Sequence, residues 1–158
     1  MLTVRQATAA DADELARLGA ELVKDTGEWT TRLADFYRHH AETDRVAAFV
    51  IDRPAGGLAA CACATITHSI PGPDHAGIYA HIHTVYTDPD HRRRGYARAT
   101  VQALTHCLTT ERGCGLITLN ASDDGAHLYR SLGFTTNQRA MRLIPTASCP
   151  TTAAQTRR

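Results

Sequence analysis

Apolar residues recur along this chain with two different spacings, and each spacing predicts one type of element. Leu15, Leu18 and Leu22 are three and four positions apart, which places them on one face of a helix. Thr8, with an acidic residue three positions later, is typical of a helix start. The pattern therefore predicts a first helix over residues 9–24.

A second helix and a series of strands follow. Trp29, Leu33 and Phe36 predict an amphipathic helix over residues 28–41. The apolar pattern then changes to a period of two, as in residues 45–52, which is typical of strands. The other predicted segments are strands over residues 2–7, 58–70, 77–87, 116–120 and 140–144, a helix from about 95 to 111 and a helix from 122 to 133.

This order of elements predicts an α/β (mixed α+β) fold. Consecutive strands in the first half favour antiparallel pairing, and the later strand–helix–strand unit favours a parallel crossover. A length of 158 residues fits one hydrophobic core. We expect one domain over residues 1–145. Residues 146–158 are rich in Thr and Ala, and we expect them to form a disordered tail.

Composition narrows the possible partners and the compartment. A formal net charge of +1 gives no argument for nucleic acid or an anionic membrane as a partner. No apolar run approaches the length of a membrane span, and residues 1–6 do not have the pattern of a signal peptide. Five cysteines without C-x-x-C pairs indicate a reduced protein, which we expect to be cytoplasmic.

Candidate chemistry concentrates in the segment Arg92-Arg93-Arg94-Gly95-Tyr96-Ala97, between a predicted strand and a predicted helix. The first N–H groups of a helix lack partners inside the helix and can bind an anion. A glycine lets the backbone approach that anion closely, and arginines add forked positive charge. The segment therefore predicts a site for a diphosphate-bearing ligand.

Two segments together resemble the GCN5-related N-acetyltransferase (GNAT) superfamily. Residues 85–98 contain Arg-x-x-Gly-x-Ala, which is similar to that family's coenzyme A loop, [Q/R]-x-x-G-x-[G/A]. Residues 119–134 resemble its A-S-x-x-G-x-x-L-Y-x-x-L-G-F pattern. The resemblance implies a mixed, twisted sheet of about six to seven strands, flanked by about four helices, with two strands splayed at the CoA site. It also implies acetyl-CoA as the acyl donor.

The residues that would bind acetyl-CoA fall into three groups. The resemblance implies that main-chain groups of Val85, Tyr86 and Thr87 contact the acetyl group and the pantetheine arm. The loop and the first helical turn would hold the diphosphate. Two polar residues after the next strand would contact pantetheine amides, although one of them, Ser122, has an alternative role as a helix cap. The diphosphate residues are Arg92, Arg93, Arg94, Gly95, Tyr96, Ala97 and Arg98, and the pantetheine residues are Asn120 and Ser122.

Acetyl transfer to an amine is helped by a base, because an alkylammonium group is almost entirely protonated at neutral pH. His81 is the leading candidate, at a position where some family members carry a glutamate. His83 lies two residues further along, on the same face of a regular strand. The alternative is that both are ordinary histidines of a half-exposed strand.

Two further groups could complete the chemistry. Tyr129 matches the tyrosine that, in many GNAT-like enzymes, donates a proton to the departing thiolate. Its alternative role is that of a packed helix residue whose hydroxyl only orients the sulfur. A main-chain N–H near Tyr86 is expected to polarise the carbonyl.

Candidates for the acceptor site lie between the first two predicted helices. Asp25 and Glu28 could attract an ammonium group and Trp29 could stack on it, because this junction borders the acceptor site in GNAT-like folds. Solvated loop charges and a core tryptophan are the alternative. Cys61 and Cys63 could carry an acyl group, but buried thiols are more common. The histidine spacing matches no zinc pattern, so we expect no metal.

We therefore predict an enzyme that moves an acetyl group from acetyl-CoA to a primary amine of a small molecule, by direct attack in a ternary complex. One alternative is a protein N-terminal or lysine acetyltransferase, and another is a non-catalytic acyl-CoA-binding regulator. A kinase is more remote, because the loop lacks Gly-Lys-Ser/Thr. A monomer and a homodimer are both compatible with the sequence.

Overall fold

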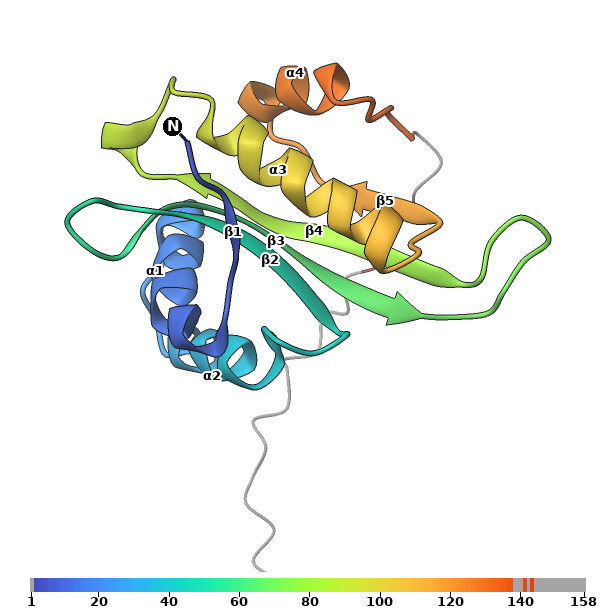
Figure 1. Ribbon diagram of the computed structural model, residues 1–158, viewed down its shortest axis with the longest axis horizontal. Coiled ribbons are helices and arrows are strands. Elements are labelled where there is room, and N and C mark those ends of the chain that lie inside the picture. Colours follow the sequence, from blue (N-terminus) through green and yellow to red (C-terminus); the bar gives the residue numbers. More distant parts are fainter. Residues whose placement is uncertain (1, 138–140, 142, 144–158) are drawn as a thin grey trace, which may run out of the picture.

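The computed structural model describes residues 2–137, 141 and 143. These residues form a mixed sheet with helices on both faces, which confirms the α/β (mixed α+β) class (Figure 1). The sheet has five strands in the described part, fewer than the six to seven expected. Most of the predicted strand 140–144 and all of the tail 146–158 lie outside the described residues. The strands, in their order across the sheet, are β1 (Arg5–Gln6), β2 (Val46–Asp52), β3 (Leu58–His68), β4 (Ile78–Thr87) and β5 (Leu116–Leu119).

Strand pairing is antiparallel from β1 to β4 and parallel between β4 and β5. The parallel pair needs a crossover, which the third helix supplies. Two helices cover one face of the sheet and two lie on the other (Figure 1). The first face carries α1 (Ala12–Val23) and α2 (Trp29–His40), and the second carries α3 (Tyr96–His106) and α4 (Asp123–Ser131).

The short helical segments refine the predicted boundaries. Before α1, Ala9–Asp11 form a 3₁₀ turn behind a capping box made by Thr8 and Asp11. Another 3₁₀ turn, Pro89–His91, follows β4. The helix predicted to about residue 111 is present, but its last part, Cys107–Glu111, is a π-helix.

Small side chains in β3 let helices pack on both faces of the sheet. This central strand is almost continuously buried, because it has neighbours on both edges and helices above and below. Cys61 and Cys63 face the α1–α2 layer, whereas Ala62 packs with α3. The sequence of a strand that is buried on both faces is a continuous apolar run, rather than an alternation of apolar and polar residues.

Helices α1 and α2 approach each other closely at Gly19. A Cβ atom added to Gly19 would lie 2.9 Å from Cδ2 of Leu33, so a larger residue there would force the Leu33 side chain to shift. Leu15 and Leu18 of α1 and Tyr37 of α2 are buried against β2 and β3. The two helices therefore form one wall that faces the strands.

A cluster of charged groups fixes the end of β4 to the rest of the molecule. The Asp88 carboxylate is mostly buried and lies 3.2 Å from Nη1 of Arg17 and 2.6 Å from Nη2 of Arg53. Arg17 also pairs with Glu14, which accepts the N–H of Leu58 at 2.8 Å. Helix α1, the start of β3 and the end of β4 are thereby held at one point. In the described part of the chain, no helix has both the length and the apolar character needed to cross a membrane.

Candidate active site

Strands β4 and β5 separate partway along their length. Their parallel pairing runs from Tyr79–Leu116 to Ile82–Leu119 and ends there. Strand β4 continues for five more residues, to Thr87, with β3 as its partner on the other edge. Beyond Ile82, no described strand pairs with this edge of β4, which is the splay that the resemblance implied.

The register with β3 decides which main-chain groups face this open edge. The N–H of Asp88 donates to the carbonyl of Ala59, and Cys61 is paired with Tyr86. In an antiparallel ladder, alternate residues direct both main-chain groups to the same side. Val85 and Thr87 consequently direct their N–H and C=O groups to the open edge, whereas those of Tyr86 face β3.

A β-bulge lies in β4 at the start of the open edge. Cys63 pairs with Thr84 and Ala64 pairs with Ile82, so His83 is the extra residue. The bulge leaves His83 and Thr84 both lining the α1–α2 side of the sheet. Val85, one residue further, packs with the α3 layer.

The predicted phosphate loop is a sharp turn that ends at the first residue of α3. Arg93 and Gly95 both have a positive φ, 62° and 79°. The first helical bond is donated by the N–H of Ala99 to the carbonyl of Gly95, and α3 has no side-chain cap. The N–H groups of the first turn are therefore available to an anion. A Cβ atom at Gly95 would have no neighbour within 4 Å among the described residues, so space is open in front of the loop.

The four arginines of this region are not equivalent. Arg92 donates from Nε to the carbonyl of Thr87 at 3.1 Å and lies over the ring of Tyr86. Arg98 donates to Oγ of Ser131 at 2.8 Å, which links α3 to α4. The two that remain, Arg93 and Arg94, are exposed and make no hydrogen bond or ion pair within the described residues.

The two histidines of β4 lie side by side on the α1–α2 face. Their ring centroids are 4.8 Å apart. Nδ1 of His81 lies 2.7 Å from Oγ1 of Thr118 in β5, and Nε2 of His83 lies 2.6 Å from Oγ1 of Thr65 in β3. Loss of contact with bulk water, and then the nearby His81, lower the pKa of His83 below its ordinary value. His83 is thus held neutral at physiological pH.

Tyr129 lies on the opposite side of the sheet, in the α3–α4 layer. Its ring packs against Phe134, with the centroids 5.9 Å apart, and belongs to the apolar cluster under α3. A Cβ atom at Gly125 would lie 3.1 Å from this ring, so the ring rests on the glycine of its own helix. Burial raises the pKa of Tyr129, which keeps the phenol protonated at neutral pH.

A cavity of about 310 Å³ opens on the other side, between α1, α2 and the strands β3 and β4. Trp29, Leu33 and Phe36 line it from α2, and His83 and Thr84 line it from the bulge. The structure therefore brings the predicted Trp29 together with one of the two predicted bases.

The acidic residues predicted beside Trp29 do not line this cavity. Asp25 is exposed and accepts the N–H of Gly27 at 2.8 Å, a local turn contact. Glu28 is exposed and occupies the N-cap position of α2, where its side chain makes no capping bond. Of the two polar residues after β5, Ser122 caps α4 by accepting the N–H of Gly125, and Asn120 is exposed.

The buried cysteines of β3 are poor nucleophiles. Cys61 is fully buried and Cys63 nearly so. A hydrogen bond to Cys63 and then burial raise the pKa of Cys61, so its thiolate is disfavoured. Among the described residues, no group of three or more His, Cys, Asp and Glu side chains is arranged to hold a metal ion.

Sequence reasoning missed the partners of the site residues. Thr65 and Thr118 orient the two histidines, and the carboxylate of Asp88 anchors the strand that leads into the loop. Their polarity is visible in the sequence, but each contact joins residues of different elements. Strand register sets the two threonine contacts, and the packing of α1 and the β2–β3 turn sets those of Asp88.

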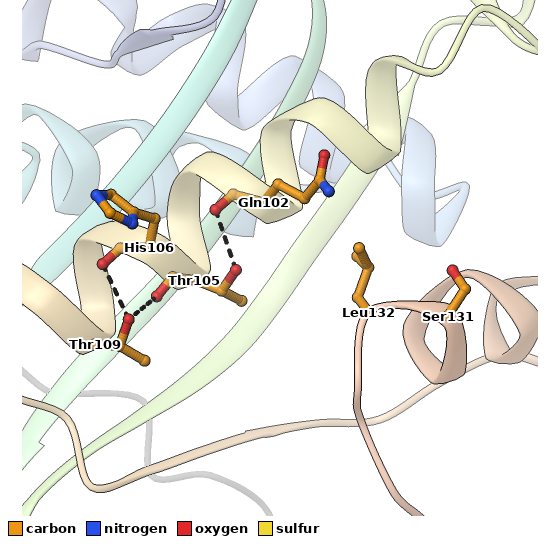
Figure 2. A pocket seen from close by; sticks show the side chains of 6 residues that line it. All are labelled: Gln102, Thr105, His106, Thr109, Ser131 and Leu132. Atoms are coloured by element: carbon orange, nitrogen blue, oxygen red, sulfur yellow. Dashed lines mark hydrogen bonds between the residues drawn. The ribbon is translucent and has the colours of Figure 1, made fainter.

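A larger hollow, of about 460 Å³, lies between α3 and the end of α4 (Figure 2). It runs from Gln102 of α3 to Thr109 of the following π-helix, away from the phosphate loop. The hydroxyls of Thr105 and Thr109 donate to carbonyls of their own helix, as Figure 2 shows. Its lining among the described residues includes no Lys, Arg, Asp or Glu, so we assign no part of the site to it.

Comparison with known proteins agrees with this geometry. Residues 13–134 match the sequence model described as the acetyltransferase (GNAT) family. The chain is 33% identical over 63 residues to a glucosamine 6-phosphate N-acetyltransferase of Trypanosoma brucei brucei; the match spans 40% of this chain and 42% of that relative.

Solved structures share the fold over nearly the whole chain. A Trypanosoma brucei acetyltransferase superposes with a TM-score of 0.69 at 25% identity, covering 92% of this chain and 100% of the other. A predicted acetyltransferase from Clostridium acetobutylicum, solved with acetyl-CoA, has a TM-score of 0.79 at 20% identity and covers 91% and 96%.

Proposed function

This chain belongs to the GNAT acetyltransferase family, and we propose that it moves an acetyl group from acetyl-CoA to a primary amine of a small molecule. The observation that carries the proposal is the open edge of β4. It leads into a helix without a side-chain cap, beside Arg93 and Arg94, which make no ion pair with any residue that the structure describes. A strand edge can bind the amide-rich pantetheine arm, and a helix N-terminus can bind a diphosphate.

We assign donor binding to particular residues of the predicted set. Val85 and Thr87 offer main-chain groups at the open edge for the acetyl carbonyl and the pantetheine amides. Arg93 and Arg94, with the N–H groups of the first turn of α3, offer positive charge to the diphosphate. Arg92 and Arg98 support the loop and helix, because their guanidinium groups already bind Thr87 and Ser131.

The reaction requires two proton movements. The neutral amine attacks the thioester carbon, the N–C bond forms, and the C–S bond breaks. The nitrogen gives a proton to a base, and the departing sulfur receives one from an acid. The products are the acetylated amine and the CoA thiol, so no other reactant is needed.

We assign the base to His83, although the sequence made His81 the leading candidate. His83 lines the cavity beside Trp29. Its lowered pKa leaves it neutral at physiological pH, so a ring nitrogen can accept a proton. In the tautomer whose Nε2–H donates to Thr65 Oγ1, the free lone pair is on Nδ1.

We assign the acid to Tyr129. Its raised pKa keeps the phenol protonated, so the O–H can donate to the sulfur as the thiolate leaves. Tyr129 and His83 lie on opposite sides of the sheet, with the open edge of β4 between their layers. Donor and acceptor can therefore be bound together, which supports direct attack in a ternary complex.

The test has two stages. Calorimetric titration of the folded protein with acetyl-CoA should show saturable binding that is weakened by Arg93→Ala plus Arg94→Ala. Release of free thiol should then depend on an added primary amine. Absence of acetyl-CoA binding would refute the donor site, and binding without turnover on a broad amine panel would favour an acyl-CoA-binding regulator. An acetylated cysteine detected by mass spectrometry would contradict direct transfer.

A further inference from the structure

We propose that the acceptor is an amphipathic amine whose apolar ring or chain occupies the cavity between α1, α2 and the bulge of β4. This inference rests on the function proposed above and specifies its substrate class. It sets the chain apart from the relative whose name specifies a phosphorylated amino sugar.

The described residues that line the cavity include no Lys, Arg, Asp or Glu. The helices contribute Leu22 and Val23 from α1 and Trp29, Leu33 and Phe36 from α2. A phosphate group in this space would meet no Lys or Arg among the described lining residues, and burial of an unpaired charge is strongly unfavourable. A polycation would likewise meet no carboxylate of the described lining, because Asp25 and Glu28 lie outside it.

The polar groups of the cavity gather at the strand side. Thr65, His83 and Thr84 come from adjacent positions of β3 and β4. The hydroxyl of Tyr37 is deeply buried, and its interactions are with Cys63 and Thr84 rather than with the open space. The cavity thus has an apolar body and one polar end, which is the pattern expected for a ligand with a single amine.

The polar end coincides with the reacting position. His83, the assigned base, is the bulge residue, and the open edge of β4 begins immediately after it. An amine beside His83 would therefore be next to a thioester held at Val85. The volume of about 310 Å³ is at the lower end of the range for small-molecule pockets. It suits one ring or a short chain.

The tryptophan gives a direct measure of occupancy, because Trp29 is the only tryptophan in the chain. We expect 2-phenylethylamine to change the emission of Trp29 saturably in the presence of CoA, and ethanolamine at the same concentration to leave it unchanged. The Trp29→Phe variant should lose this signal. Equal responses to both amines, or no response to 2-phenylethylamine, would overturn the inference.

Steady-state kinetics provides the second measure. We expect KM for 2-phenylethylamine to be at least tenfold lower than for ethanolamine or D-glucosamine 6-phosphate. Leu22→Arg should raise KM for 2-phenylethylamine at least tenfold with a smaller change for ethanolamine. Leu22 is 41% exposed at the cavity wall, so the arginine can be accommodated without unfolding. Leu2→Arg is the matched control, since Leu2 is also 41% exposed but lies outside the cavity.

The outcomes separate the two proposals. Turnover of ethanolamine or D-glucosamine 6-phosphate with the lower KM would refute the apolar acceptor and leave the acetyltransferase intact. Equal effects of Leu22→Arg on both kinds of amine would also refute it. If no amine is turned over although acetyl-CoA binds, the proposed reaction fails, while the Trp29 titration still decides whether the cavity binds apolar amines.

Discussion

His83 and His81 have the same side chain on the same strand, but their surroundings give them different properties. His81 is held to β5 through Thr118, whereas His83 is the bulge residue and borders the cavity. Burial, and then the nearby His81, lower the pKa of His83. A base is useful when its neutral form predominates at the working pH, and His83 meets that condition.

The pH dependence of activity tests this assignment. Protonated His83 cannot accept a proton, so kcat/KM should fall as the pH decreases through a pKa below about 6.5. His83→Gln should remove this acidic limb and lower kcat/KM about 100-fold at pH 7.5. His81→Gln is the control and should retain the limb. A normal limb in His83→Gln would show that another group is the base.

Tyr129 should matter for the chemical step and little for binding. Tyr129→Phe keeps the packing against Phe134 but removes the proton donor. We expect kcat to fall about 10- to 100-fold, with the Kd of acetyl-CoA changed by less than about twofold. Stopped assays of thiol release and calorimetry measure the two quantities. Tyr79→Phe, whose hydroxyl contacts His75 in the β3–β4 hairpin, is the control. Unchanged kcat in Tyr129→Phe would exclude the acid role.

At the scale of elements, the connection from β4 to α3 contains the two site residues with a positive φ, Arg93 and Gly95. Two residues with positive φ reverse the chain within three positions, and α3 begins at once without a side-chain cap. The guanidinium of Arg92 ties the loop back to the end of β4. The element is therefore arranged so that its free N–H groups face open space.

Gly95→Ala tests this element. An alanine at φ 79° costs about 1 kcal/mol of stability, and its methyl group would project into the space in front of the loop. We expect the Kd of acetyl-CoA to rise about tenfold. Gly56→Ala is the matched control, because Gly56 has φ 95°, has equally open surroundings and lies in the β2–β3 turn. It should lose similar stability by chemical denaturation with unchanged Kd. Equal Kd values in both variants would contradict the loop assignment.

At the scale of the whole molecule, the sheet separates the groups assigned to the two halves of the proposed reaction. The proposed donor loop and Tyr129 belong to the α3–α4 side, and the cavity and His83 belong to the α1–α2 side. The two sides of the sheet are connected beyond Ile82, where β5 no longer pairs with β4. Asp88, held by Arg17 of α1 and Arg53 of the β2–β3 turn, fixes the strand end between them.

The ion pairs of Arg5 in β1 predict how the free energy of unfolding changes in acid. Arg5 binds Asp11 at 2.8 Å and Asp52 at 2.7 Å, and these bonds lower the pKa of both carboxyl groups. Because both carboxyl pKa values are lower in the folded than in the unfolded protein, the unfolded chain binds more protons in acid. The stabilisation from these pairs is therefore complete above about pH 5 and is lost as the pH falls below about 4. Chemical denaturation from pH 7 to pH 3 should show the decrease.

Arg5→Gln should weaken this dependence. It should lower the free energy of unfolding at pH 7 by about 1 kcal/mol, because the exposed parts of the pairs are screened by solvent. It should also reduce the change between pH 5 and pH 3. Arg38→Gln, which removes exposed pairs with Asp13 and Asp35, is the control and should change neither quantity by more than about 0.5 kcal/mol. A pH profile of Arg5→Gln equal to that of the unaltered protein would refute the explanation.

The sequence by itself determined the types and order of the elements, because these depend on contacts between near neighbours. Helical spacing predicted α1 and α2, and the capping role of Ser122 was recognised as one of two possibilities. The glycine of the phosphate loop was also visible, since a strand followed by a helix requires a turn there. The domain boundary at residue 145 stays a prediction, because it falls outside the described residues.

Only the tertiary structure decided which members of each predicted group can act together. Three features depend on residues far apart in the chain. They are the bulge at His83, the direction of the Tyr86 main-chain groups towards β3, and the hydrogen bond from Arg98 to Ser131. The same is true of the cavity, whose walls come from two helices and two strands. Spacing along a chain encodes which side chains share a face. It does not encode which distant face will pack opposite, and that packing sets the burial of each side chain, the pKa of each titratable group and the shape of the cavity.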